Sequence, residues 1–150
     1  MNSKQPNPYV KKSEISGFII ERTAKRMKQR FKRMLKEAKV GVTVDQWIIL
    51  QLLDQRDGLS QFEIASDTFK DAPTVTRIID LLCKKDLCER VADQKDRRKF
   101  NIHLTKKGKE KVVEVKPITK DFRKIGWNGL SDEDINEMSR ILNVIFNNLA

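Results

Sequence analysis

One stretch, LSQFEIASDTFKDAPTVTRIIDLLCKKD at 59–86, constrains the fold more than any other part of the sequence. Ser60 and Glu63 have the three-residue spacing of a helix capping box, so a short helix is expected over about 61–67. A second helix is expected over about 71–85, because Asp71 can cap it and apolar residues then recur at three- and four-residue steps. These apolar residues are Val75, Ile78, Ile79, Leu82 and Cys83. Two such helices joined by a short turn predict a helix-turn-helix.

Two runs that are typical of β-strands follow the second helix. The first is LCERVAD, and the second is KFNIHLT, in which Phe100, Ile102 and Leu104 alternate with polar residues. The loop between them, DQKDRRK at 93–99, crowds charges of both signs together. A helix-turn-helix followed by a charged hairpin predicts a winged helix-turn-helix, so the chain is expected to be mainly α-helical with a small β-hairpin wing.

The net charge of +10 is concentrated in two parts of the chain. Residues 1–40 carry +9 and residues 83–125 carry +8, whereas 41–82 and 126–150 are acidic. Charge gathered into blocks indicates a surface for a polyanion and favours nucleic acid over a membrane; a merely solvated surface is the alternative. No apolar run approaches a membrane span and the first residues do not resemble a signal peptide, so a cytoplasmic protein is expected.

Residues that carry chemistry in enzymes and metal sites are scarce. Two cysteines, Cys83 and Cys88, and a single histidine, His103, do not make a four-ligand zinc site, so no metal or cofactor is expected. The sequence has no glycine-rich phosphate loop, no serine or cysteine with a plausible histidine partner, and no paired-carboxylate motif. The pattern therefore argues against an enzyme.

Helices with an apolar seam are expected at both ends of the chain. Apolar residues at three- and four-residue steps predict one helix before Gly41 and two after Thr105, with Pro117 kinking or interrupting the first of those two. These seams exceed what a small winged domain needs to cover itself, so they predict a dimer interface, with an ordinary core as the alternative. The expected interface residues are Ile20, Phe31, Ile118, Phe122, Ile135, Met138, Leu142, Ile145 and Leu149.

The segment ERVADQKDRRKFNIHLTKKG, with DQWIILQLL and TVTRIIDLL before it, resembles the MarR family of bacterial transcriptional regulators. The resemblance implies a single domain over residues 1–150, with a winged helix-turn-helix at about 43–105 and dimerisation helices at about 10–40 and 106–150. It also implies a homodimer that binds a pseudo-palindromic operator in double-stranded DNA, mostly as a repressor, and that a small organic effector releases. Trp47 is the candidate effector contact. Asp86 replaces a glycine that is usual in the family, so a left-handed residue is expected there.

DNA contacts are expected from three places. The helix over 71–85 would enter the major groove, a helix N-terminus at 60–61 would bind phosphate, and the loop at 93–99 would reach the backbone or the minor groove. The expected contact residues are Ser60, Gln61, Pro73, Thr74, Thr76, Arg77, Lys84, Lys95, Arg97, Arg98 and Lys99.

Asp96 is expected to shape the wing. Its position and that of Arg98 are paired in the family, so Asp96 is expected to accept hydrogen bonds from Arg98, whose planar guanidinium would bind the carboxylate and the minor groove together.

The alternative function, from another class, is a winged-helix module that binds an acidic protein. Selectivity for one DNA sequence would distinguish a regulator from such a module.

Overall fold

The computed structural model describes residues 17–150, which form six helices and three strands. The helices are α1 (Gly17–Glu37), α2 (Val44–Gln55), α3 (Gln61–Thr68), α4 (Ala72–Lys84), α5 (Lys106–Gly126) and α6 (Asp132–Asn148). The strands are β1 (Leu59–Ser60), β2 (Cys88–Ala92) and β3 (Phe100–Leu104). The part of the first expected helix that precedes Gly17 lies outside the described residues. The fold class is confirmed as mainly α-helical with a small wing.

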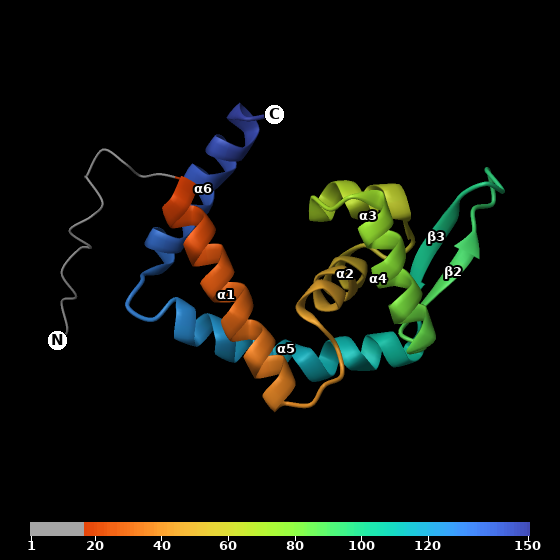
Figure 1. Ribbon diagram of the computed structural model, residues 1–150, viewed down its shortest axis with the longest axis horizontal. Helices are drawn as coiled ribbons and strands as arrows, with labels where there is room; N and C mark the ends of the chain where they lie inside the picture. The colour runs from red at the N-terminus through yellow and green to blue at the C-terminus, as the bar shows by residue number, and fades with distance from the viewer. Residues whose placement is uncertain (1–16) are drawn as a thin grey trace.

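The helices divide between two limbs that α5 joins (Figure 1). One limb, which we call the winged lobe, holds α2, α3, α4 and the β-hairpin, and the other holds α1 and α6. α5 runs along the base of the view from the foot of the hairpin to the limb of α1. Within residues 17–150, no helix is both long and apolar enough to cross a bilayer.

The wing belongs to an antiparallel sheet of three strands in the order β1-β3-β2. Cys88 of β2 pairs with Leu104, and Leu59 of β1 pairs with Ile102 on the other side of β3. The sequence predicts β2 and β3 but not β1, because two residues are too few to show an alternating pattern. β1 ends at Ser60, which caps α3, so the sheet fixes where α3 begins.

The core lies in the winged lobe and extends along α5. α4 buries Val75, Ile78, Ile79 and Leu82, as its periodicity predicts. The largest fully buried side chains come from α2, α3, α4, β3 and α5 and are Ile49, Leu50, Leu53, Ile64, Val75, Ile79, Leu82, Ile102, Val112 and Val115.

Phe31 also belongs to this core, which corrects its expected place on a dimer surface. Its side chain is only 7% exposed, and its ring lies against Phe122 of α5 with centroids 5.1 Å apart. The periodicity that marked Phe31 as apolar could not distinguish α5 of the same chain from a second copy. Phe31 therefore joins α1 to α5 within one chain.

Local signals set the helix ends where the sequence predicts them. Ser60 and Ser131 each form a capping box, in which the hydroxyl accepts from the amide three residues on and that residue's carboxylate accepts from the cap amide. Asp71 caps α4 by accepting from the amide of Thr74 at 2.8 Å. These caps satisfy amides that a helix leaves without partners, so the turn between α3 and α4 is defined locally.

Two further expectations concern single residues. Asp86 has a φ of 57°, which confirms that the position before β2 needs a left-handed residue. Pro117 does not interrupt its helix, because α5 continues through it to Gly126. Pro117 and Val113, whose carbonyl loses its usual donor, are both exposed, so water can reach that carbonyl.

The segment LTKKG at 104–108 connects β3 to α5 and packs the start of α5 against the turn before β2. The hydroxyl of Thr105 accepts from the amide of Gly108 at 2.9 Å and donates to the carbonyl of Asp86. A Cβ on Gly108 would overlap the carbonyl oxygen of Leu87. Only glycine fits at this approach of α5 to the wing, and this requirement accounts for the early glycine of the helix.

Candidate nucleic-acid interface

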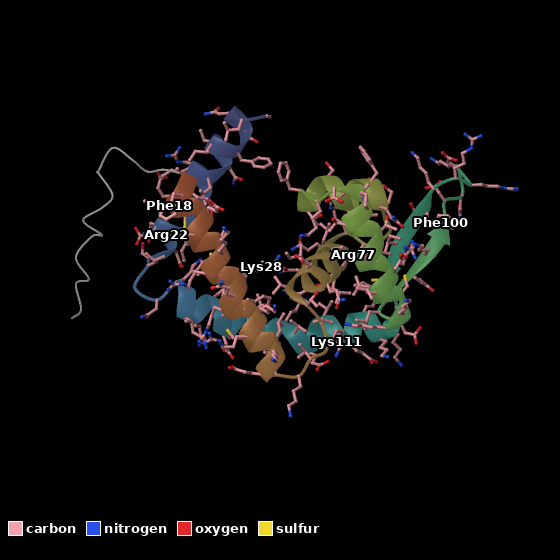
Figure 2. The ribbon with its side chains drawn as sticks, viewed as in Figure 1. Phe18, Arg22, Lys28, Arg77, Phe100 and Lys111 are labelled. Atoms are coloured by element: carbon pink, nitrogen blue, oxygen red, sulfur yellow. The ribbon has the colours of Figure 1, made fainter. Side chains whose placement is uncertain are left out.

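The outer face of α4 carries the side chains that are expected to meet DNA. Those that are exposed are Pro73, Thr76, Arg77 and Lys84. Thr74 is half-buried, and its hydroxyl donates to the carboxylate of Asp71 at 2.8 Å, so it forms part of the helix cap. Arg77, labelled on α4 in Figure 2, makes no ion pair within residues 17–150. Lys84 is likewise unpaired there, but only the planar guanidinium of Arg77 can donate two parallel hydrogen bonds, so Arg77 is the side chain of this face best suited to read a base.

A polar network ties α3, α4 and β2 together. Gln61 donates from Nε2 to the hydroxyl of Thr76 at 3.0 Å and accepts at Oε1 from Nε of Arg90 at 3.1 Å. A terminal nitrogen of Arg90 pairs with Asp80 of α4. The side chain of Gln61 is thus a brace inside the lobe, and only its first-turn amide is left for the expected phosphate contact.

Arg90 has a structural role that the sequence alone does not indicate. It lies on β2, and its guanidinium reaches both α3, through Gln61, and α4, through Asp80. The wing strand is thereby held at a fixed distance from the outer face of α4. The one available signal is its place at the start of ERVADQKDRRKFNIHLTKKG, the segment that carries the family resemblance.

The wing loop is shaped mainly by Asp93. Its carboxylate accepts hydrogen bonds from the amides of Lys95 at 2.7 Å and Asp96 at 3.1 Å, and from the side-chain amide of Asn101 at 3.2 Å. These hydrogen bonds, with that of the Lys95 amide the strongest, hold the pKa of the Asp93 carboxyl below its ordinary value. The amide of Asp93 in turn donates to the carbonyl of Lys99 at 2.9 Å and closes the loop.

Asp96 also shapes the wing, but not through the expected group. Its carboxylate accepts from the backbone amide of Arg98 at 3.0 Å. The guanidinium of Arg98 forms no ion pair in the described part of the chain, which corrects the expectation that its planar head binds Asp96. A carboxylate readily reaches the amide two residues on in a tight turn, and this local bond leaves the guanidinium free.

The wing therefore separates its two kinds of charge. Its acidic side chains bond to backbone amides, whereas its cationic side chains are exposed and have no ion-pair partner among residues 17–150. These cations are Lys95, Arg97, Arg98 and Lys99. Arg56 and Arg90 of the same lobe, by contrast, are paired with Asp67 and Asp80. Unpaired cations on a rigid hairpin are suited to phosphate contacts.

Comparison with known proteins agrees with this geometry. A sequence model of the MarR family matches residues 42–100, which span α2 to the start of β3 and include the wing loop. A structure of a MepR–DNA complex from S. aureus is 28% identical, with a TM-score of 0.79 over 89% of this chain and 97% of that chain. The chain belongs to the MarR family. It is accordingly a transcriptional regulator with a winged helix-turn-helix, and not an enzyme.

Two transcriptional repressors extend the similarity beyond the winged lobe. The transcriptional repressor CouR, bound to a 23-mer DNA duplex, is 27% identical with a TM-score of 0.80, over 89% of this chain and 93% of that chain. The HTH-type transcriptional repressor IacR of Pseudomonas putida is 23% identical over 139 residues, which are 93% of this chain and 82% of the relative. The similarity to both proteins thus reaches the helices that flank the winged lobe.

α6 of this MarR-family chain has an apolar face that residues 17–150 leave uncovered. None of its residues is buried. Met138, Leu142 and Ile145 are 38–40% exposed, and Leu149 is 81% exposed, whereas Ile135 is half-buried. Of the other expected interface residues, Ile20 is 39% exposed, and Ile118 and Phe122 are partly buried against the core. Apart from Phe31, the expected interface residues thus keep apolar surface free.

A cavity of about 400 Å³ lies between α2 and α5. Trp47, which is 3% exposed, forms part of its wall, and α5 contributes four cations, Lys116, Lys120, Arg123 and Lys124. Lys116 pairs with Asp54 at 2.9 Å, and the other three form no ion pair within residues 17–150. Thr119 also lines the cavity, and its buried Oγ1 has no hydrogen-bond partner among the described residues. The cavity therefore offers an aromatic wall, positive charge and an unsatisfied hydroxyl.

The side chains that could bind a metal are dispersed. Within residues 17–150, no three histidine, cysteine or acidic side chains come together. Burial raises the pKa of the Cys88 thiol to about 12 and also raises that of Cys83, so both stay protonated at neutral pH. His103 lies instead against Asp57, with Nδ1 3.2 Å from the carboxylate.

Proposed function

We propose that this MarR protein is a homodimer that binds a pseudo-palindromic operator in double-stranded DNA and represses transcription. The whole chain would form one domain, with the winged helix-turn-helix at about 43–105 and dimerisation helices on either side. The observation that carries the proposal is the charge separation in the winged lobe. Within residues 17–150, Arg77 and the wing cations are exposed and form no ion pair, whereas the neighbouring carboxylates of Asp93 and Asp96 accept from backbone amides.

α4 would enter the major groove and the wing would follow the backbone into the minor groove. Arg77 can donate two parallel hydrogen bonds to a guanine, which is the commonest specific contact of an arginine with DNA. Arg98 would enter the minor groove, where narrow A·T-rich stretches concentrate negative potential. Pro73, Thr76 and Lys84 would lie along the same groove as Arg77, and Thr74 would act through the cap of α4. Lys95, Arg97 and Lys99 would bind phosphates, and Gln61 would add its first-turn amide. Ser60, whose own amide donates to Glu63, would act through its hydroxyl.

The exposed face of α6 supports the dimer. Most of the stability of a helix in a protein comes from packing of its apolar face, and α6 buries no residue against the described part of its own chain. A second copy presents the same face, so a symmetric contact can cover Ile20, Met138, Leu142, Ile145 and Leu149 of each chain. Ile135, Ile118 and Phe122 would complete it from their half-buried positions.

The cavity beside Trp47 supports a small organic effector. It lies where α2 meets α5, so a ligand there would contact both the winged lobe and the helix that leads to the proposed dimer interface. Its free cations and the unsatisfied hydroxyl of Thr119 favour an anionic ligand, and the indole favours an aromatic one. Ligand binding would favour a spacing of the dimer's two winged lobes that does not match the operator, so the DNA would be released.

The test of the proposal combines mass and binding measurements. Light scattering at micromolar concentration should give twice the mass of one chain. Fluorescence anisotropy should then show preference for one duplex over random DNA of the same length by at least about a thousandfold. A folded monomer, or equal affinity for all duplexes, would contradict the proposal. Equal affinity together with binding to an acidic protein would support a protein-docking module.

A further inference from the structure

A groove of about 940 Å³ lies between the start of α3 and the wing. Two phenylalanine rings border it. Phe62, the second residue of α3, is 82% exposed, and Phe100, the first residue of β3, is 48% exposed. Figure 2 shows Phe100 on the hairpin, on the same limb as Arg77. Large aromatic rings left in water beside a basic loop indicate a contact surface, because burying them on a partner is favourable.

The polar lining of the groove is suited to an anion. Arg98 and Lys99 line it and form no ion pair in the described part of the chain. The two carboxylates that also line it are already engaged. Asp93 accepts from the wing amides, and Glu63 accepts from the amide of Ser60 at 2.8 Å. Because these amide hydrogen bonds stabilise the two carboxylates, the side chains of the groove that remain available to a ligand are the cations Arg98 and Lys99 and the two phenyl rings.

We propose that this groove holds one sugar-phosphate strand of DNA, with Phe62 and Phe100 packed against deoxyribose faces, Lys99 near a phosphate and Arg98 on the side of the strand that faces the minor groove. A DNA strand alternates charged phosphates with apolar sugar faces, and the groove places cations and phenyl rings together in a matching way. The groove is continuous with the proposed DNA-binding surface, because the wing that carries Arg98 forms one of its walls. The inference rests on the proposed DNA-binding function and adds an apolar contact that does not depend on base sequence.

The salt dependence of binding distinguishes this contact from charge. A lysine that binds a phosphate releases a counterion, so its loss reduces the slope of log affinity against log salt by about one. A phenyl ring on a sugar releases none. Phe62→Ala should therefore weaken binding to selected and random duplexes alike by about tenfold at every salt concentration, without changing the slope. Lys99→Ala should change the slope, and Phe62→Leu should retain part of the lost affinity.

Phe69→Ala is the matched control. Phe69 is 84% exposed, much like Phe62, but it follows the opposite end of α3, the end that faces α6 in Figure 1. Its ring lies against Phe146 of α6, with centroids 5.6 Å apart. Phe69→Ala should leave DNA affinity unchanged. Hydroxyl-radical footprinting should show sugars protected by the unmodified protein and exposed again with Phe62→Ala.

Three results would overturn the inference. The first is unchanged affinity of Phe62→Ala and of Phe100→Ala for a duplex that the unmodified protein binds. The second is a loss confined to the selected sequence, because a sugar contact carries no sequence information. The third is a sharp DNA kink, seen by end-to-end energy transfer, that disappears with Phe62→Ala, since the ring would then be a wedge between bases. Failure of the unmodified protein to bind any duplex would instead overturn the proposed function and remove the basis of this inference.

Discussion

Removal of the Arg90 brace should loosen the winged lobe and weaken DNA binding. The Arg90 side chain is 28% exposed and its partner Asp80 is 52% exposed, so the ion pair contributes only about 0.2–1 kcal/mol to stability. The hydrogen bond from Nε to Gln61 adds about 0.5–1.5 kcal/mol. Arg90→Ala should therefore lower the free energy of unfolding by about 0.7–2.5 kcal/mol. Arg90→Lys should recover less than half of this loss, because an ammonium group cannot reach both partners as a planar fork does.

A double-mutant cycle makes this prediction quantitative. Urea unfolding of Arg90→Ala, Asp80→Ala and the double variant gives the coupling energy between the two side chains. DNA affinity, measured in parallel, should fall more for Arg90→Ala than for Lys109→Ala, which removes the same charge from an exposed residue without an ion pair in the described chain. Arg90 is not a brace if two results are found together. The effects of Arg90→Ala and Asp80→Ala on the free energy of unfolding add up to that of the double variant within about 0.3 kcal/mol, and Arg90→Ala binds DNA as tightly as Lys109→Ala.

Three further predictions address the dimer, the wing and the contact of α5 with Leu87. Ile145→Glu should dissociate or unfold the dimer, because it places an unpaired charge in the proposed interface, whereas Glu133→Gln should leave the mass from light scattering unchanged. The pKa of Asp93 is held low by the Lys95 amide and its neighbours, so its stabilising effect should be complete above the unfolded value of about 3.9 and be lost as pH falls through the lower folded value. Carboxyl NMR should follow this titration, and a midpoint at or above 3.9 would contradict it. Gly108→Ala should destabilise the fold by about 1–3 kcal/mol in urea unfolding, since its Cβ would overlap the Leu87 carbonyl, and an unchanged midpoint would show that the backbone yields freely.

The helices could be predicted from the sequence because their signals are local. The capping box of Ser60 and Glu63 predicted a helix over 61–67, and the structure has it at Gln61–Thr68. The apolar steps of the next helix predicted its buried face, including Val75 and Leu82. These features depend on residues three or four positions apart, so a single sequence contains them.

The brace and the details of the wing could not be predicted in this way. Arg90 bonds to Gln61, 29 positions away, and that contact depends on how β2 and α3 are placed by the sheet. Within the wing, several donors compete for each carboxylate, and the sequence does not show that amides rather than the Arg98 guanidinium satisfy Asp96. Phe31 was misplaced for a related reason, since an apolar periodicity identifies a buried face without identifying its partner.

Selection of bound duplexes from a random pool tests the central claim most directly. A dimer that presents two copies of α4 and of the wing should enrich an inverted repeat whose half-site centres lie about one helical turn, or about 10 base pairs, apart. Arg77→Ala should relax the preference at one position in each half-site, with a loss of about 1–3 kcal/mol on the selected duplex. Recovery of an inverted repeat with this dependence on Arg77 is the predicted result. A pool that stays random after repeated rounds, or a repeat that is unchanged with Arg77→Ala, would contradict the account of this surface as a sequence reader.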